Sequence, residues 1–178
     1  MTDREQLNIA RERVIDSVAQ NMDLYGVTES IGRLYGMLLF QQNPMTLDEM
    51  KEELGMSKTS MSTSVRTLLE LKMVDKVWRK GVRKDLYSAE EDWYQTFIDF
   101  FTIKWRLAIT ENVYAIEKSM NEIKALLNKD GVSEDVIKDG EKDLEKLHYA
   151  LNYYDWLDRF VDSLESHEIF NLIPKKEE

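Results

Sequence analysis

Hydrophobic residues recur every three or four positions along both ends of the chain, which is the spacing of one face of an α-helix. At the N-terminal end this pattern predicts one helix over residues 4–25 and a second over residues 28–41. The apolar stripe of the first helix comprises Leu7, Val14, Val18 and Met22. Gly32 and Gly36 lie one turn apart in the second helix, where they let another helix or a ligand approach the backbone closely.

At the C-terminal end the pattern predicts two long helices. Ser88 and Glu91 form a capping box that begins a helix running to about Asn128, without an internal Gly or Pro. The segment KDGVSED interrupts it, and a last helical region follows to about residue 170. Its apolar residues recur at spacings of three, four or seven, which suits helix-to-helix packing. They are Leu144, Leu147, Leu151, Tyr154, Val161 and Leu164.

Between these helices, local signals predict a helix-turn-helix. Thr46 and Glu49 form a capping box for a short helix, and Gly55 suits its left-handed end. Ser57 can cap the next helix at once, so a turn of about three residues joins two short helices. The second helix, SKTSMSTSVRTLLE, places Met61 and Val65 on its core side and most of its hydroxyls on the outer side.

A basic hairpin is predicted directly after this helix. Strand-forming residues run from Met73 to Trp78, Gly81 lies in a cationic turn, and residues 82–87 can return as a second strand. This is the wing of a winged helix. The predicted fold is therefore mainly α, a winged helix-turn-helix with long N- and C-terminal dimerisation helices. The expected divisions are N-terminal helices, winged domain, C-terminal helices and flexible tail, at residues 1–41, 42–88, 89–170 and 171–178.

Charge is distributed unevenly along the chain. The formal net charge is −10, yet residues 56–84 hold eight Lys and Arg against two acidic residues. Such a local patch favours a polyanionic partner, and Ser and Thr hydroxyls suit contacts with base edges and phosphates in the major groove. We expect Arg66 to contact guanine or phosphate, and the wing cations to follow the backbone or minor groove of double-stranded DNA. The DNA-binding residues predicted are Ser57, Lys58, Thr59, Ser60, Ser62, Thr63, Arg66, Thr67, Arg79, Lys80, Arg83 and Lys84.

Other chemistries find little support in the composition. The chain has no cysteine, and His148 and His167 are its two imidazoles, without an HExxH motif or an accompanying carboxylate cluster. No nucleophile, base and orienting group occur at a familiar spacing, so we expect no enzyme activity, no metal and no cofactor. The N-terminus is charged and no apolar run approaches about 20 residues, which predicts a cytoplasmic protein without a membrane partner.

Three segments carry a family resemblance: NMDLYGVTESIGRLYGMLLF, MTLDEMKEELGMSKTSMSTSVRTLLELKMVDKVWRKGVRKDLY and WYQTFIDFFTIKWR. The order of elements resembles the MarR superfamily of winged-helix repressors. More narrowly, the segments resemble GbsR-type regulators, bacterial repressors of genes for osmoprotectant uptake and glycine betaine synthesis. The resemblance covers residues 8–110 most clearly. It implies a homodimeric repressor and, as in choline-responsive members, a quaternary ammonium effector held by aromatic rings.

Aromatic residues for such a site are present in the sequence. A quaternary ammonium group donates no conventional hydrogen bond, so ring faces bind it, at about 0.5–2 kcal/mol each. The predicted ligand-binding residues are Tyr35, Phe40, Trp93, Tyr94, Phe97 and Phe100. The same rings can instead be core between the N-terminal helices and the long helix. Two further functions stay open: a MarR-type repressor with another effector or none, and a winged-helix adaptor that binds protein.

Overall fold

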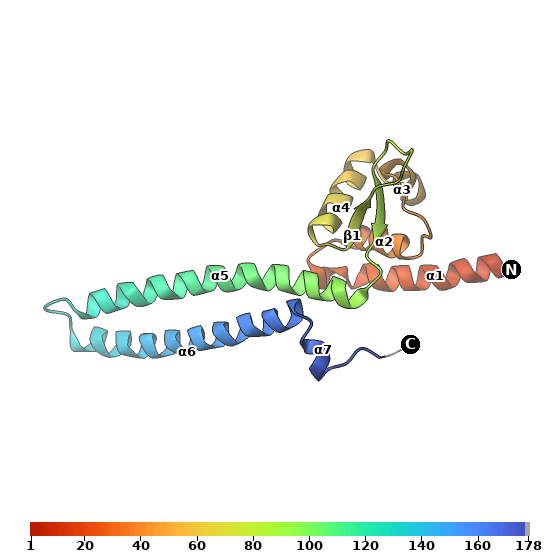
Figure 1. The fold of residues 1–178 in the computed structure, drawn as a ribbon. Helices are drawn as coiled ribbons and strands as arrows, with labels where there is room; N and C mark the ends of the chain where they lie inside the picture. Colours follow the sequence, from red (N-terminus) through yellow and green to blue (C-terminus); the bar gives the residue numbers. More distant parts are fainter. Residues whose placement is uncertain (177–178) are drawn as a thin grey trace. The chain divides into compact units, whose positions relative to one another are not determined.

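The computed structural model describes residues 1–176, and the chain divides into two compact units, Met1–Phe100 (unit 1) and a second beginning at Phe101 (unit 2). Figure 1 shows the elements in chain order: α1 (Asp3–Gln20), η1 (Met22–Tyr25), α2 (Glu29–Leu39), α3 (Leu47–Leu54), α4 (Lys58–Glu70), β1 (Val74–Val77), β2 (Leu86–Ala89), α5 (Trp93–Leu127), α6 (Glu134–Glu165) and α7 (Ile169–Leu172). None of the helices described is both long and apolar enough to cross a membrane.

The unit boundary differs from the domain divisions expected from the sequence. The expected divisions at residues 41 and 88 both fall inside unit 1, so the N-terminal helices, the winged region and the first turns of α5 form one compact body. The tail expected from residue 171 begins within α7, and its last two residues, 177–178, lie outside the described residues.

Glycines set the close packing of α1 on α2. A Cβ atom on Gly32 would lie 2.9 Å from the Cα of Ala19, and one on Gly36 would lie 3.2 Å from the Cα of Ile15. The expected close approach at this glycine pair is therefore made by a helix. The predicted stripe of α1 is partly wrong, because its buried side carries Ile15 and Ala19, whereas Leu7 and Val14 are exposed.

The predicted helix-turn-helix is confirmed at its caps. Thr46 Oγ1 accepts a hydrogen bond from the Glu49 backbone N–H, and the Glu49 carboxylate accepts one from the Thr46 backbone N–H at 2.7 Å. Gly55 ends α3 with a left-handed φ of 64°, and Ser57 Oγ accepts a 3.1 Å hydrogen bond from the Ser60 backbone N–H at the start of α4. These local bonds fix the angle at which α4 leaves α3.

The core of unit 1 lies beneath these helices. Leu34 of α2, Met50 of α3, and Met61 and Leu68 of α4 are each fully buried in one cluster, together with Val74 of β1. Because α4 contributes buried residues along its whole inner side, packing holds it firmly despite its many hydroxyls. The opposite side of α4 is left to solvent.

The wing is a two-stranded antiparallel hairpin. Its register runs from Val74 opposite Ala89 to Val77 opposite Leu86. The second strand starts later than predicted, because residues 78–85 form the connecting loop and Val82 is exposed within it. A backbone bridge from Met45 to Tyr87, with both hydrogen bonds at 2.8 Å, ties the hairpin to the segment before α3.

The start of α5 also differs from the prediction. Ser88 pairs with Asp75 inside the hairpin, so it cannot cap a helix with Glu91. Asp92 takes that role, since its Oδ1 accepts hydrogen bonds from the backbone N–H groups of Tyr94 and Gln95 at 2.9 and 3.2 Å. α5 therefore begins at Trp93, five residues after the predicted cap.

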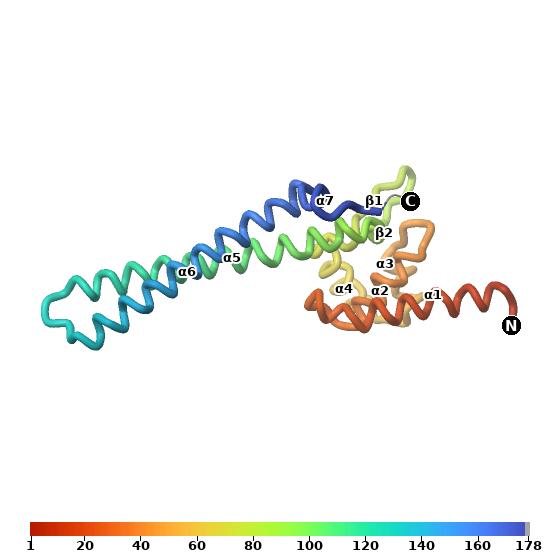
Figure 2. Tube along the Cα trace, turned by 90° about the horizontal axis from the view of Figure 1, so that it is seen from below, coloured from red at the N-terminus to blue at the C-terminus, as the bar shows by residue number. Residues whose placement is uncertain are grey.

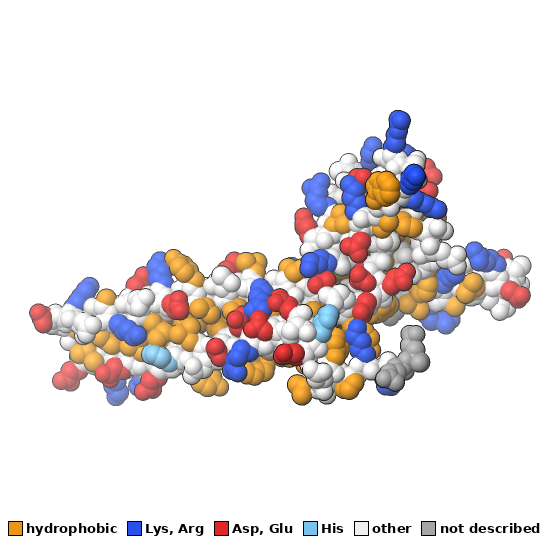
Figure 3. Space-filling model, in the orientation of Figure 1, with side chains coloured by type: hydrophobic (Ala, Val, Ile, Leu, Met, Phe, Trp, Pro, Cys, Tyr) orange, Lys and Arg blue, Asp and Glu red, His pale blue; other side chains and the backbone are white. Residues whose placement is uncertain are grey.

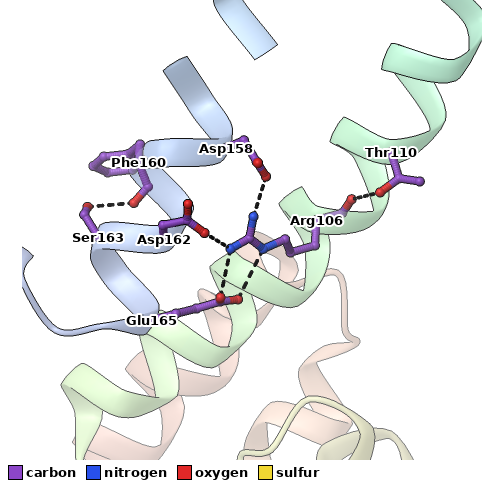
Figure 4. Close-up of polar contacts among 7 residues, drawn as sticks. All are labelled: Arg106, Thr110, Asp158, Phe160, Asp162, Ser163 and Glu165. Atoms are coloured by element: carbon purple, nitrogen blue, oxygen red, sulfur yellow. Dashed lines mark hydrogen bonds and ion pairs between the residues drawn. The ribbon is translucent and has the colours of Figure 1, made fainter. Parts of the chain in front are cut away.

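Unit 2 is a hairpin of two long helices, α5 and α6, which run side by side in both Figure 1 and Figure 2. Ile109, Leu157 and Val161 form its small buried cluster, with aromatic rings packed around it. Arg106 of α5 binds three carboxylates of α6, those of Asp158, Asp162 and Glu165, and these contacts raise the pKa of Arg106 further above its ordinary value, chiefly through the hydrogen bond with Glu165 (Figure 4).

Candidate DNA-binding face and ligand cavity

The outer side of α4 presents a row of hydroxyl and cationic groups. Ser57, Lys58, Thr59, Ser60, Thr63 and Arg66 are exposed, as predicted for residues that contact DNA. Ser62 and Thr67 are half-buried. Thr67 also donates its hydroxyl to the Thr63 carbonyl at 3.1 Å, so its side chain already has a partner within the helix.

Cations gather at the wing. Arg79, Lys80 and Arg83 are exposed in the loop between β1 and β2, and within residues 1–176 none of the three forms an ion pair. Figure 3 shows Lys and Arg side chains concentrated over the end of unit 1 that carries this loop. Uncompensated cations next to an exposed helix are the electrostatic requirement for binding a phosphate backbone.

Lys84, the fourth wing cation predicted, differs from the others. Its Nζ lies 2.7 Å from Asp48 Oδ2 at the first turn of α3, which lowers the pKa of Asp48 and raises that of Lys84. In this structure the charge of Lys84 is therefore partly neutralised by the protein itself. The two side chains remain largely exposed, so the pair can exchange partners readily.

Trp78 is a residue that the sequence reasoning left out. It follows β1 directly, adjoins Arg79 and leaves 81% of its surface exposed. A tryptophan so exposed on a basic loop is available for contact with a sugar, a base or a groove wall. In the sequence, its position between a predicted strand and three cations could have marked Trp78 as a candidate for DNA contact.

A cavity of about 370 Å³ lies within unit 1, between α1, η1, α2 and the start of α5. Three aromatic residues line it, Tyr25, Tyr35 and Trp93, and the side chains of Met22 and Met73 add apolar surface. Its volume lies within the range of small-molecule sites, and its composition combines aromatic and apolar walls with a few polar groups.

The cavity contains two of the six predicted ligand-binding residues, Tyr35 and Trp93. Phe40 lines a separate, more polar cavity with Pro44 and Glu49, so the structure does not bring it together with Tyr35 and Trp93. Tyr94, Phe97 and Phe100 do not line the cavity of Tyr35. Helical rotation accounts for Tyr94, because it directly follows Trp93 on α5 and so faces a different direction.

Two further aromatic residues, Tyr25 and Phe100, lie at or near the cavity wall. Phe100 packs against a lining residue, since its ring centroid lies 4.6 Å from that of Tyr25. Tyr25, which is not among the six predicted ligand-binding residues, lies in η1 directly after α1. Its proximity to Tyr35 and Trp93 arises from the tertiary fold.

Polar groups occupy another part of the lining. Ser17 and Asn21 contribute from the end of α1, and Thr96 contributes from the first turn of α5. Burial raises the pKa of Tyr35, and the neighbouring Thr96 hydroxyl opposes that effect. Tyr35 is therefore a neutral phenol at physiological pH.

Comparison with known proteins finds a family match in the C-terminal helices and relatives that match most of the chain. Residues 93–171 match the family described as GbsR family transcriptional regulator, C-terminal helical hairpin. The HTH-type transcriptional repressor GbsR of Bacillus subtilis (strain 168) is 44% identical over 165 residues, covering 93% of this chain and 91% of the relative. The HTH-type transcriptional repressor OpcR of the same organism is 40% identical over 169 residues, covering 95% and 91%.

A solved structure shares the fold at lower sequence identity. The crystal structure of a transcriptional regulator superposes with a TM-score of 0.55 and 16% identity, covering 89% of this chain and 98% of that one. The likeness to the two repressors extends over both units and includes α4 and the wing. The chain therefore belongs to the GbsR family of transcriptional regulators, and is not an enzyme.

Proposed function

We propose that the protein is a homodimeric transcriptional repressor that binds operator DNA through α4 and the wing, and that a small quaternary ammonium compound in the unit 1 cavity controls its affinity. The observation that carries the proposal is the outer face of α4, where exposed hydroxyls and Arg66 adjoin the unpaired cations of the wing. Both named Bacillus relatives are transcriptional repressors, which supports repression rather than activation as the function of this protein.

Exposed apolar surface supports the homodimer. On α1 of unit 1, Leu7, Ile9 and Val14 are each at least 40% exposed. In unit 2, Tyr153 and Trp156 leave about half of their surface exposed and stack in a row with Phe160 along α6. Apolar side chains gathered in this way are typical of surfaces that pair with another protein chain.

The aromatic lining of the cavity supports the effector. Tyr25, Tyr35 and Trp93 all line one cavity, and among residues 1–176 no Lys or Arg lines it. A methylated cation gains from ring faces and from the absence of competing positive charge. Choline and glycine betaine are candidate ligands through the resemblance to GbsR-type regulators, which also suggests genes for osmoprotectant uptake or synthesis as targets.

The DNA proposal is tested with operator fragments selected from the source genome by the purified protein. We expect Arg66→Ala to weaken operator binding and to relax base preference by about 1–3 kcal/mol at its contact. Arg83→Ala should weaken binding to all sequences and reduce the slope of log affinity against log salt by about one unit. If neither variant alters binding, α4 and the wing do not contact DNA, and the adaptor function is favoured.

Two further measurements test the other parts of the proposal. Light scattering should give a dimer at micromolar concentration. We expect the operator of this dimer to have two half-sites centred about 10 bp apart. Choline titration should change operator affinity, and operator DNA must then change choline affinity by the same factor. A protein that binds its operator but gives no heat with millimolar choline or glycine betaine would be a repressor with another effector or none.

A further inference from the structure

Several hydroxyl groups of α4 are already engaged within the protein. Ser57 Oγ accepts a hydrogen bond from the Ser60 backbone N–H at 3.1 Å, and it donates one to Ser60 Oγ at 2.9 Å. Thr67 donates its hydroxyl to the Thr63 carbonyl, and Ser64 is buried on the core side. These contacts hold the helix and its first turn, so α4 offers fewer hydroxyls to DNA than its composition suggests.

A narrower stripe runs along the middle of the exposed side of α4. At 3.6 residues per turn, Thr59, Thr63 and Arg66 fall within an arc of about 60°. All three side chains are exposed, and within residues 1–176 none of them forms a hydrogen bond or an ion pair. Lys58 and Ser60 lie about 100° to either side of Thr59. In a groove, the middle stripe therefore faces the base edges and the flanks face the phosphates.

Charge at the two ends of α4 orients the helix. Lys58 and the partial positive charge of the helix N-terminus favour phosphate at the first turn, whereas the exposed carboxylate of Glu70 repels phosphate at the last turn. The N-terminal half is therefore the part that enters the groove. From Thr59 to Arg66 the helix rises about 10.5 Å, which is close to three base-pair steps of about 3.4 Å.

The chemistry of the stripe selects its bases. Threonine carries a methyl group on the same carbon as its hydroxyl, and serine lacks it. In the major groove thymine is the base that presents a methyl group, and a threonine methyl makes a favourable apolar contact with it. The guanidinium of Arg66 suits the O6 and N7 acceptors of guanine.

We propose that Thr59 and Thr63 are specificity-determining residues, and that their methyl groups contact thymine methyl groups within about three base pairs of the guanine bound by Arg66. Ser57 and Ser60 hold the helix end and carry no base preference. The inference rests on the proposed function, because it requires α4 to enter the major groove of the operator.

Replacement of thymine by uracil tests this, because uracil lacks only the methyl group. Single replacements are made across one half-site of an operator fragment selected by the full-length protein, and fluorescence anisotropy measures the affinity. Wild type should lose about fourfold at each of two positions, the factor for one buried methyl group at about 0.8 kcal/mol. Thr59→Ser should become insensitive to uracil at one of these positions, and Thr63→Ser at the other.

Ser60→Ala is the matched control, since it removes a hydroxyl from the flank of the same helix. It should weaken binding to all fragments by one common factor and keep both uracil effects. Loss of either uracil effect in Ser60→Ala would overturn the division between threonines and serines.

The other outcomes separate this inference from the proposed function. If wild type binds no DNA, both fail. If wild type binds its operator and uracil has no effect at any position, the repressor stands and the threonine contacts are overturned. The same holds if both serine variants remain as sensitive to uracil as wild type. Because the wild-type scan needs no variant, a substitution that prevents folding leaves the test intact.

Discussion

Lys84 Nζ lies 2.7 Å from Asp48 Oδ2, so one cation of the wing is held against the first turn of α3. On the proposed DNA-binding face this carboxylate competes with phosphate for Lys84. We expect Asp48→Asn to tighten operator binding and to steepen the salt slope by about one unit, because Lys84 is then available to a phosphate. Fluorescence anisotropy over a series of salt concentrations measures both quantities.

The control for that variant is Glu53→Gln, which removes the same charge from the same short helix without a contact to Lys84. Because Lys84 lowers the pKa of Asp48, the carboxylate stays charged throughout the neutral range. The pair forms above that lowered pKa and is lost only as the pH falls through it, so the effect should be constant between about pH 6 and 8. Equal effects of the two variants would mean that net charge alone is responsible.

Trp78 should report DNA binding directly. With 81% of its surface exposed beside Arg79, its fluorescence is sensitive to any contact with bases or sugars. We expect operator DNA to quench a component of emission that is missing in Trp78→Phe, and Trp78→Ala to weaken binding severalfold for specific and nonspecific DNA alike. If Trp78→Ala binds DNA with normal affinity, and operator DNA quenches its emission as much as that of wild type, this side chain lies outside the interface.

Gly32→Ala should destabilise unit 1. The added methyl group would overlap the Met22 side chain and approach the backbone of Ala19 to 2.9 Å, so α1 must move away from α2. We expect a loss of about 1–3 kcal/mol in the free energy of unfolding, typical of overpacking. Gly36→Ala is the matched comparison, since its closest contact is 3.2 Å and its loss should be smaller. Chemical denaturation of both variants measures these losses. A larger loss for Gly36→Ala than for Gly32→Ala would contradict the prediction.

Arg106→Met should weaken the helical hairpin of unit 2. One guanidinium contacts three carboxylates of α6, and its removal leaves those negative charges close together without a cation (Figure 4). The partners are substantially exposed, so we expect a loss of only about 1 kcal/mol, at the upper end for surface pairs. Arg159→Met, which breaks one exposed pair with Asp155, should cost less. High salt should reduce the difference in melting temperature between the variants.

Local signals in the sequence were sufficient for the helix-turn-helix. The bonds that define it join residues about three positions apart, as between Thr46 and Glu49 or between Ser57 and Ser60. The same kind of signal failed at Ser88 and Glu91, because Ser88 belongs to a strand and pairs with Asp75, which lies outside the window of a capping motif. Capping motifs are thus reliable only where no long-range pairing competes for the same residues.

The cavity was less accessible to sequence reasoning. The family resemblance grouped Tyr35 with Trp93, and both line this cavity, but nothing in the sequence separated Phe40 from them.

The cavity lining and the DNA-binding face share no side chain, although both belong to unit 1. On the proposed function, a substitution at Trp93 therefore changes which metabolite is sensed without altering a residue that contacts the operator. Gene duplicates of such a repressor can diverge in effector while they still occupy the same promoters. Regulatory circuits built from this fold can acquire new inputs one mutation at a time.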